Sequence, residues 1–517
     1  MADDALSAAL ETGRLTEAEY ALERARSLFQ LPRVRQAFGD VVRPPAHDAT
    51  LILRDLAVRL QELRGKDRSV AEAILARPTS GNVPIGHAYS TASRFTCGSD
   101  TCIHWVETTA DAPDMTVTIP PDDIPVWIDT VQSTWEDVWA QEIDQLLYRA
   151  PLDDGSSKQT DGPSGGDKRK LDVYVLDLGE DGLFGYCAPL TGDLTTAVYC
   201  VVDNDYTPLQ YGQSQTPEAF LQVTSAHEFH HASQAAYDFQ EDYWLLEGTA
   251  ANMEETVYPA IDDNVTFLNF WSPLSRPSSP LDRGGFGNSE YGSWIFWRFL
   301  QEKIGGDPAI VREIWERADA YDPSPLPADD PPDDYSLEAA RHELTERGLG
   351  FADVFASFAT TNRLLDYVDA EDAGYPSVPL TKTFKVGQQN PVRRWRSWKI
   401  SHLAARVFSF KPGRQVPADA RLRVATRLPA HGAVVTLIVV EADGSTATRR
   451  LERGDKGYAR GSARFGHGVV KRIEVVLSNG STRMRSCWTF LGPPSYSCFG
   501  RSRDDHRVFE LRGKLIP

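Results

Sequence analysis

Apolar positions recur at helical spacing in several segments before about residue 390, and after it short apolar runs are separated by turns. The first predicted helix opens at Thr16 and Glu19, whose spacing is that of a capping box. Short apolar runs bounded by polar residues predict strands between the helices. We therefore expect helices at 16–31, 48–63, 67–76, 124–147, 217–239 and 243–257, and strands at 102–108, 171–178 and 197–203.

From about residue 391 onward the pattern changes to short apolar runs separated by turns. The runs 433–441 and 469–477 are each followed by a turn dipeptide, Asp443-Gly444 and Asn479-Gly480, which is typical of antiparallel hairpins. This pattern predicts a C-terminal β-sandwich. The expected fold class is α+β, with a helical segment at 1–80, a mixed domain at 81–390 and an all-β domain at 391–517.

The candidate chemistry lies in the helix predicted at 217–239, where Thr216 suits the N-cap and Pro217 the first turn. His227 and His231 are four residues apart, so their imidazoles lie on one face, one turn apart. Two imidazoles so placed can both reach one zinc ion at about 2.0–2.1 Å. Glu228 could then poise a metal-bound water, as in the H-E-x-x-H arrangement of zinc peptidases.

A second segment, Trp244 to Ala250, supplies another carboxylate, Glu247. Catalytic zinc takes three protein ligands and keeps one position open, so Glu247 would complete a His₂Glu set. The two segments together resemble the gluzincin superfamily, and the wider run 227–259 resembles secreted bacterial neutral zinc metallopeptidases distantly akin to immune inhibitor A. The resemblance implies that His227, His231 and Glu247 are zinc ligands and that Glu228 is the general base.

The same resemblance implies a zincin-like catalytic domain, whose edge strand binds extended substrate; we assign that strand to 197–203. It also implies a downstream tyrosine that stabilises the oxyanion, for which Tyr291 is the candidate, with Tyr258 and Tyr335 as alternatives. A tyrosine that only packs at a helix start explains Tyr291 equally well.

Several positions depart from related patterns. Gln234 and Tyr237 occupy the positions where a metzincin needs Gly and His, which excludes that family. Glu254 or Glu255 could orient a ligand histidine from outside the metal site, or belong to a solvated helix face. His230 is expected to point away from the metal, as a surface or packing residue.

Charge is distributed unevenly along the chain, which has 517 residues and a net charge of −19. Residues from 391 onward hold 25 basic and nine acidic side chains, a balance of +16, which leaves −35 for the rest. This asymmetry supports a boundary near 390. The basic part could dock on the acidic part or attract anionic cell-surface polymers. No nucleic-acid-binding motif is present, so no nucleic-acid partner is expected.

The six cysteines form three close pairs, 97 with 102, 187 with 200 and 487 with 498, which suggests three local disulfides and hence export. A cytosolic protein with reduced thiols is the alternative. Residues 1–4 have neither a basic nor an apolar region, so we expect that a leader was removed. No apolar run approaches the roughly 18 residues that a transmembrane helix needs. Acidic residues at 153–167 and 329–334 could bind Ca²⁺, although a solvated acidic loop explains them better.

The sequence thus predicts a secreted zinc metallopeptidase, more consistent with an endopeptidase because no acidic anchor for a substrate amino terminus is evident. Its partner would be a protein or peptide substrate. The alternatives are an inactive zincin-like binding or adhesion protein that uses its basic β-domain, and a zinc hydrolase of a non-peptide bond. Residues 1–80 could form a pro-segment or an ordinary N-terminal subdomain.

Overall fold

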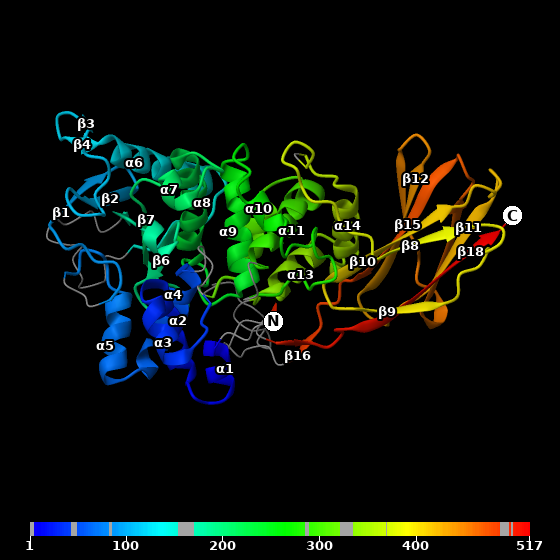
Figure 1. Ribbon diagram of the computed structural model, residues 1–517, viewed down its shortest axis with the longest axis horizontal. Coiled ribbons are helices and arrows are strands. Elements are labelled where there is room, and N and C mark those ends of the chain that lie inside the picture. The colour runs from blue at the N-terminus through cyan, green and yellow to red at the C-terminus, as the bar shows by residue number, and fades with distance from the viewer. Residues whose placement is uncertain are drawn as a thin grey trace. The chain divides into compact units, whose positions relative to one another are not determined.

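The computed structural model describes residues 5–42, 49–81, 85–153, 170–284, 289–320, 334–368, 370–485, 496–497 and 500–516. The chain folds into two compact units of mixed helix and strand, which confirms the α+β class (Figure 1). The first unit contains the described residues up to Asn264 together with 315–320. The second contains the described residues of Val265–Ile314 and those from Asp334 onward. The domain boundaries expected near residues 80 and 390 stay predictions.

A five-stranded sheet organises the first unit. Its strand order is β1-β2-β5-β7-β6, in which the three central strands are parallel and the two outer strands antiparallel. Strands β2, β5, β6 and β7 are buried throughout, as expected for a sheet with helices on both faces. The strands are β1 (Ser93–Cys97), β2 (Thr101–Val106), β5 (Leu171–Leu176), β6 (Gly185–Pro189) and β7 (Val198–Asp203), and a separate hairpin pairs β3 (Thr118–Ile119) with β4 (Ile124–Pro125).

The N-terminal helices cover one face of this sheet. Leu22 of α2, Leu53 of α4 and Ile74 of α5 share a core with Tyr174 and Tyr199 of the sheet. The predicted capping box at Thr16 is present, and the three predicted helices are confirmed with shifted ends. The N-terminal segment is therefore packed into the first unit, and a role as pro-segment stays a prediction. Its helices are α1 (Ala5–Glu11), α2 (Glu17–Phe29), α3 (Leu31–Phe38), α4 (Ala49–Arg59), the 3-10 helix η1 (Leu60–Glu62) and α5 (Gly65–Ile74).

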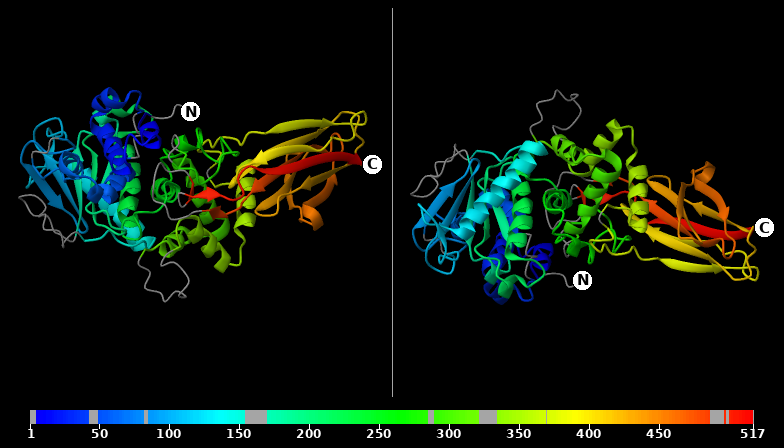
Figure 2. Two further views of the ribbon diagram at one scale, coloured as in Figure 1. Left: turned by 90° about the horizontal axis from the view of Figure 1, so that it is seen from below. Right: turned by 90° about the horizontal axis from the view of Figure 1, so that it is seen from above.

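Helices α6 and α8 cover the opposite face and pack side by side (Figure 2). Trp135 of α6 meets Phe229 of α8 edge to face, with ring centroids 6.2 Å apart. The helix predicted at 124–147 instead ends at Trp139 and continues as a π-helix. The remaining elements are α6 (Val126–Trp139), the π-helix η2 (Ala140–Gln145), the 3-10 helix η3 (Gly179–Asp181), α7 (Pro208–Tyr211), α8 (Pro217–Gln234) and α9 (Tyr243–Val257).

The strand predicted to be the edge of the sheet lies inside it. Strand β7 is hydrogen-bonded on both sides, to β5 and β6, so the assignment of residues 197–203 to the edge is wrong. The two edge strands are β1 and β6, and β6, which the sequence prediction did not include, is the edge strand next to β7. The chain forms β6 first and then returns through a short connection as β7, which lies between β5 and β6 and pairs antiparallel with β6.

Two of the three predicted disulfides are present, Cys97–Cys102 and Cys187–Cys200. Each joins residues that face each other in neighbouring antiparallel strands. The pair 487 and 498 lies outside the described residues. Two disulfides fit an oxidising, extracellular environment. In the part of the chain that the structure describes, no helix has the length and apolarity that crossing a bilayer requires.

The second unit combines helices with a β-sandwich. A five-stranded sheet of order β13-β12-β15-β10-β8 and a four-stranded sheet of order β14-β11-β18-β9 enclose one core (Figure 1). Strand β12 has the predicted bounds. The strands are β8 (Lys382–Val386), β9 (Arg396–Ile400), β10 (Ala404–Pro412), β11 (Arg421–Arg427), β12 (Ala433–Glu441), β13 (Thr446–Arg450), β14 (Tyr458–Arg464), β15 (Val470–Asn479) and β18 (Arg507–Ile516), with a small hairpin of β16 (Met484–Arg485) and β17 (Arg501–Ser502).

Helix α14 of this unit packs on the outer face of the five-stranded sheet, and α12 begins in this unit and ends within residues assigned to the first. The helices are α10 (Val265–Leu268), the 3-10 helix η4 (Tyr291–Ser293), α11 (Trp294–Phe299), the π-helix η5 (Leu300–Gly305), α12 (Ala309–Arg317), α13 (Leu337–Glu346) and α14 (Phe351–Leu364), with a 3-10 turn η6 (Asp455–Gly457) in the sandwich.

Candidate metal centre

Helix α8 carries the two histidines in the predicted arrangement. Thr216 caps its first turn by accepting a hydrogen bond from the Ala219 amide, and Pro217 occupies the first turn. His227 and His231 are 1% and 0% exposed, and their ring centroids lie 4.9 Å apart. The two imidazoles therefore share one buried face of the helix.

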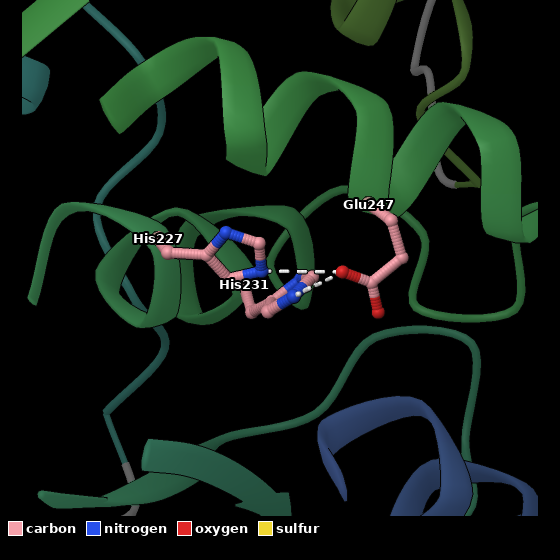
Figure 3. Close-up of side chains that lie close together, drawn as sticks. All are labelled: His227, His231 and Glu247. Atoms are coloured by element: carbon pink, nitrogen blue, oxygen red, sulfur yellow. Dashed lines mark hydrogen bonds and ion pairs between the residues drawn. The ribbon is translucent and has the colours of Figure 1, made fainter. Parts of the chain in front are cut away.

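Helix α9 brings a carboxylate to the same point. Glu247 Oε2 lies 3.1 Å from His227 Nε2 and 3.4 Å from His231 Nε2 (Figure 3). One ligand atom from each of the three residues lies within 4.8 Å of the other two. The structure thus brings together the three residues that the sequence predicted as metal ligands.

The outer nitrogen of each imidazole has its own partner. His227 Nδ1 lies 2.7 Å from Glu254 Oε1, and His231 Nδ1 lies 2.7 Å from Gln234 Oε1. The Gln234 amide nitrogen donates to the Leu246 carbonyl and to Thr249 Oγ1, which fixes its oxygen toward His231. Each Nδ1 therefore lies beside an oxygen acceptor outside the three-residue cluster, and each Nε2 faces Glu247.

The three groups interact strongly through their charges. Burial raises the pKa of Glu247, but the imidazoles of His231 and His227 outweigh it and lower that pKa to about 2. Burial lowers the pKa of His227, but its hydrogen bonds to Glu247 and Glu254 outweigh it and raise that pKa well above the usual value. Within the described residues, buried His231 Nε2 and Glu247 Oε1 have no hydrogen-bond partner. Two imidazole nitrogens and a carboxylate around one point form a donor set that suits a divalent cation.

Glu228 lies on the adjoining face of α8 and is 1% exposed. The Thr50 hydroxyl of α4 donates to Glu228 Oε2 at 2.8 Å and accepts from the Cys187 amide at 2.8 Å. Burial raises the pKa of Glu228, while the nearby His231 and His227 lower it in part. Gly185 lets the strand approach, since a Cβ there would lie 3.2 Å from Glu228 Cγ. Glu228 is thus held between α4 and the edge strand β6.

The sequence also made predictions for three residues near the metal ligands, Glu254, Glu255 and His230. Glu254 contacts His227, and both Glu254 and Glu255 are buried, so the solvated-face alternative is wrong. Burial raises the pKa of Glu254 to about 7, against the lowering effect of His227. His230 is fully buried and its Nδ1 lies 2.8 Å from Glu142 Oε2, which supports a packing role and excludes a surface one.

The predicted oxyanion donor belongs to the second unit. Tyr291 is 0% exposed at the start of η4, and its ring stacks on Phe267 with centroids 5.0 Å apart. The alternatives are Tyr258, which follows α9 in the first unit, and Tyr335 in the second unit. The catalytic role of all three stays a prediction from the sequence. Most of the acidic residues proposed for Ca²⁺, at 154–167 and 329–333, lie outside the described residues.

Sequence reasoning missed two contributors to the site. Gln234 stands three residues after His231, so helical spacing alone could have identified it as a neighbour. Thr50 is separated from Glu228 by 178 residues, and no local pattern indicates that contact. Comparison with known proteins adds no family to this description. No protein-family model matches the sequence, and no curated protein is similar enough in sequence to count as a relative.

Proposed function

We propose that the protein is a zinc-dependent peptidase in which His227, His231 and Glu247 hold the metal. The observation that carries the proposal is the convergence of three buried ligand atoms, while both Nδ1 atoms are bound elsewhere. The donor set of two imidazoles and one carboxylate is that of catalytic zinc sites with an open fourth position. An antiparallel strand at the sheet edge beside α8 fits the zincin-like arrangement that the sequence resembles.

Bound zinc would lower the pKa of a water ligand toward about 7 and polarise the scissile carbonyl. Glu228 is the residue that moves the proton. Because the Thr50 hydroxyl holds Oε2, the proton of the attacking water is received on Oε1 and then delivered to the leaving amine. Burial, which raises the pKa of Glu228, favours the protonated intermediate state of this carboxyl.

The second candidate is a binding or adhesion protein with a zinc site that does not turn over. The observation that favours it is burial, because His227, Glu228, His231 and Glu247 are each no more than 1% exposed. A peptide must reach these side chains to be cleaved, so a peptidase needs an opening step that a binding protein does not.

Metal content and hydrolysis together separate the two candidates. Elemental analysis of the full chain should find one equivalent of zinc, lost in Glu247→Ala and retained in Glu218→Ala, a matched change at an exposed position of α8. Cleavage of quenched fluorescent peptides should fall at least about 100-fold in Glu228→Gln with zinc retained. The assay is repeated after limited proteolysis, which would expose a site blocked by N-terminal residues.

Absence of zinc from the wild-type chain after dialysis against the metal would refute the metal site. Stoichiometric zinc without hydrolysis, before and after proteolysis, would favour the binding protein. Hydrolysis of esters or other small substrates but of no peptide would favour a zinc hydrolase of a different bond. Tyr291→Phe tests the predicted oxyanion donor, because it should slow turnover and leave the zinc content unchanged.

A further inference from the structure

We propose that the outer face of the four-stranded sheet of the sandwich binds a linear acidic polysaccharide. The proposal concerns a surface of the second unit and does not depend on the metal centre. This surface, which we call the basic face, is formed by cationic side chains of all four strands. They are Arg421, Arg423 and Arg427 of β11, Arg460 and Arg464 of β14, Arg512 and Lys514 of β18, and Lys399 of β9.

Alternation along the strands places these cations on one side of the sheet. In β11, Leu422 and Val424 point into the sandwich core, so Arg421 and Arg423 point outward. The register extends this pattern to the neighbouring strands, because each outward cation faces an outward position across the ladder. Seven of the eight side chains are exposed, and Arg512 is half-buried.

Several of these cations face each other directly. The register opposes Arg421 to Arg464 on one side of β11, and Arg423 to Lys514 on the other. Directly opposite residues have Cβ atoms about 4.5–5.5 Å apart, and like charges in that position destabilise a sheet. The arrangement therefore opposes folding, and it becomes favourable when an anionic partner covers it.

Acidic side chains do not neutralise the basic face. Glu510 is the one carboxylate on its four strands, and it lies 3.7 Å from Arg427. For the other seven cations, no ion pair occurs among the described residues. The opposite sheet differs, because α14 packs on it and Arg363 and Arg450 form ion pairs with Glu474 and Asp353. The five-stranded sheet thus carries a helix and ion pairs on its outer face, whereas the basic face carries eight cations and its four strands carry one carboxylate.

The arginine side chains of the basic face suit a ligand that carries carboxylate groups at intervals along a polymer. Guanidinium groups pair with planar carboxylates through two parallel hydrogen bonds, and the cations extend over four strands of the sheet. The whole chain carries −19, so attraction of a polyanion must be local to this surface.

Two features favour a polysaccharide over a nucleic acid. Binding of single-stranded nucleic acid relies on stacking of bases on open aromatic rings. On the basic face, Arg512 lies over the Trp395 ring at 4.9 Å and Arg460 over the Tyr458 ring at 5.3 Å, which occupies one side of each ring. The two disulfides fit an oxidising environment such as the outside of a cell, where acidic polysaccharides are surface components.

The experiment measures binding of the full chain to polygalacturonate, with neutral dextran as the uncharged comparison. The basic-face variant combines Arg421→Gln, Arg423→Gln and Lys514→Gln. A control variant removes the same charge from the other sheet region by Lys382→Gln, Lys385→Gln and Arg414→Gln, all at exposed positions. Because the first variant relieves like-charge opposition, its melting temperature should equal or exceed that of the wild type, which verifies its fold.

The wild type should bind polygalacturonate in 20 mM salt, bind it more weakly as salt rises, and not bind dextran. An exposed charge pair contributes up to about a fivefold change in affinity, so the basic-face variant should bind roughly 10- to 100-fold more weakly. The control variant should bind like the wild type. Equal losses in both variants, or no binding to polygalacturonate at low salt, would overturn the proposal. Tighter binding to single-stranded DNA or to phosphatidylglycerol vesicles would overturn the choice of partner.

Discussion

The contact between α4 and Glu228 gives the sharpest prediction, tested by Thr50→Val. The substitution keeps the shape of a fully buried side chain and removes its hydroxyl. Two hydrogen bonds of 2.8 Å are lost, one from the Cys187 amide and one to the Glu228 carboxylate. Valine can replace neither, so a buried donor and a buried acceptor each lose a partner.

The expected cost follows from those two groups. An unsatisfied buried polar group costs about 1–3 kcal/mol, and more when it is charged, so the two together should cost about 3 kcal/mol. For a unit of this size, roughly 2–4 °C of melting temperature corresponds to each kcal/mol, which predicts a decrease of roughly 6–12 °C. Scanning calorimetry without added metal measures the shift, and hydrogen exchange of residues 185–189 should show a less protected edge strand.

The pH dependence sharpens this test. The Thr50 hydroxyl lowers the pKa of Glu228 in part against the effect of burial, so its loss raises that pKa further. A carboxyl with a raised pKa in the folded state destabilises the fold above its unfolded pKa, near 4.3, and the penalty grows as pH rises. The difference between variant and wild type should therefore be larger at pH 8 than at pH 5.

Thr50→Ser is the matched control, because it retains the hydroxyl and removes only a methyl group. It should lose far less stability than Thr50→Val and show no added pH dependence. The reasoning is refuted if valine and wild type melt together, or if serine is as destabilised as valine.

Two further predictions concern the metal centre and the second unit. Gln234→Leu removes the acceptor that orients His231, so the affinity for zinc, measured by competition with a chelator, should fall about 10- to 100-fold. The control variant Glu218→Gln should bind zinc like the wild type, and equal affinities of Gln234→Leu and wild type would contradict the role of Gln234. The melting temperature of the wild type should decrease between pH 6.5 and 10, because His402 is an ion-pair partner of Asp282 at 2.9 Å. His402→Asn should show a smaller decrease, and the same dependence of melting temperature on pH in both proteins would contradict the role of His402.

The sign of the His402 effect follows from its pKa. Burial lowers that pKa, but the carboxylate of Asp282 outweighs burial and raises it to about 9. The folded state therefore holds the proton more tightly than the unfolded state, whose histidine titrates near 6.5. The stabilisation is complete below pH 6.5 and is lost as pH rises through about 9.

The sequence by itself determined the local parts of this protein. Helix α9 has the predicted bounds, and α8 begins at the predicted cap, because capping and helical periodicity depend on residues within a few turns. For the same reason the spacing of His227 and His231 was readable. Strand β12 was predicted correctly because its short apolar run and the following turn are also local.

Only the tertiary structure decided what lies around those parts. The edge position of β6 depends on which strands pair, and strand pairing is set by contacts between distant segments. Thr50 reaches Glu228 across 178 residues because the N-terminal helices share a core with the sheet. The register that sets Arg421 opposite Arg464 is likewise a property of the folded sheet. These partners are set by packing between segments that are distant in the sequence, so no local spacing of residues predicts them.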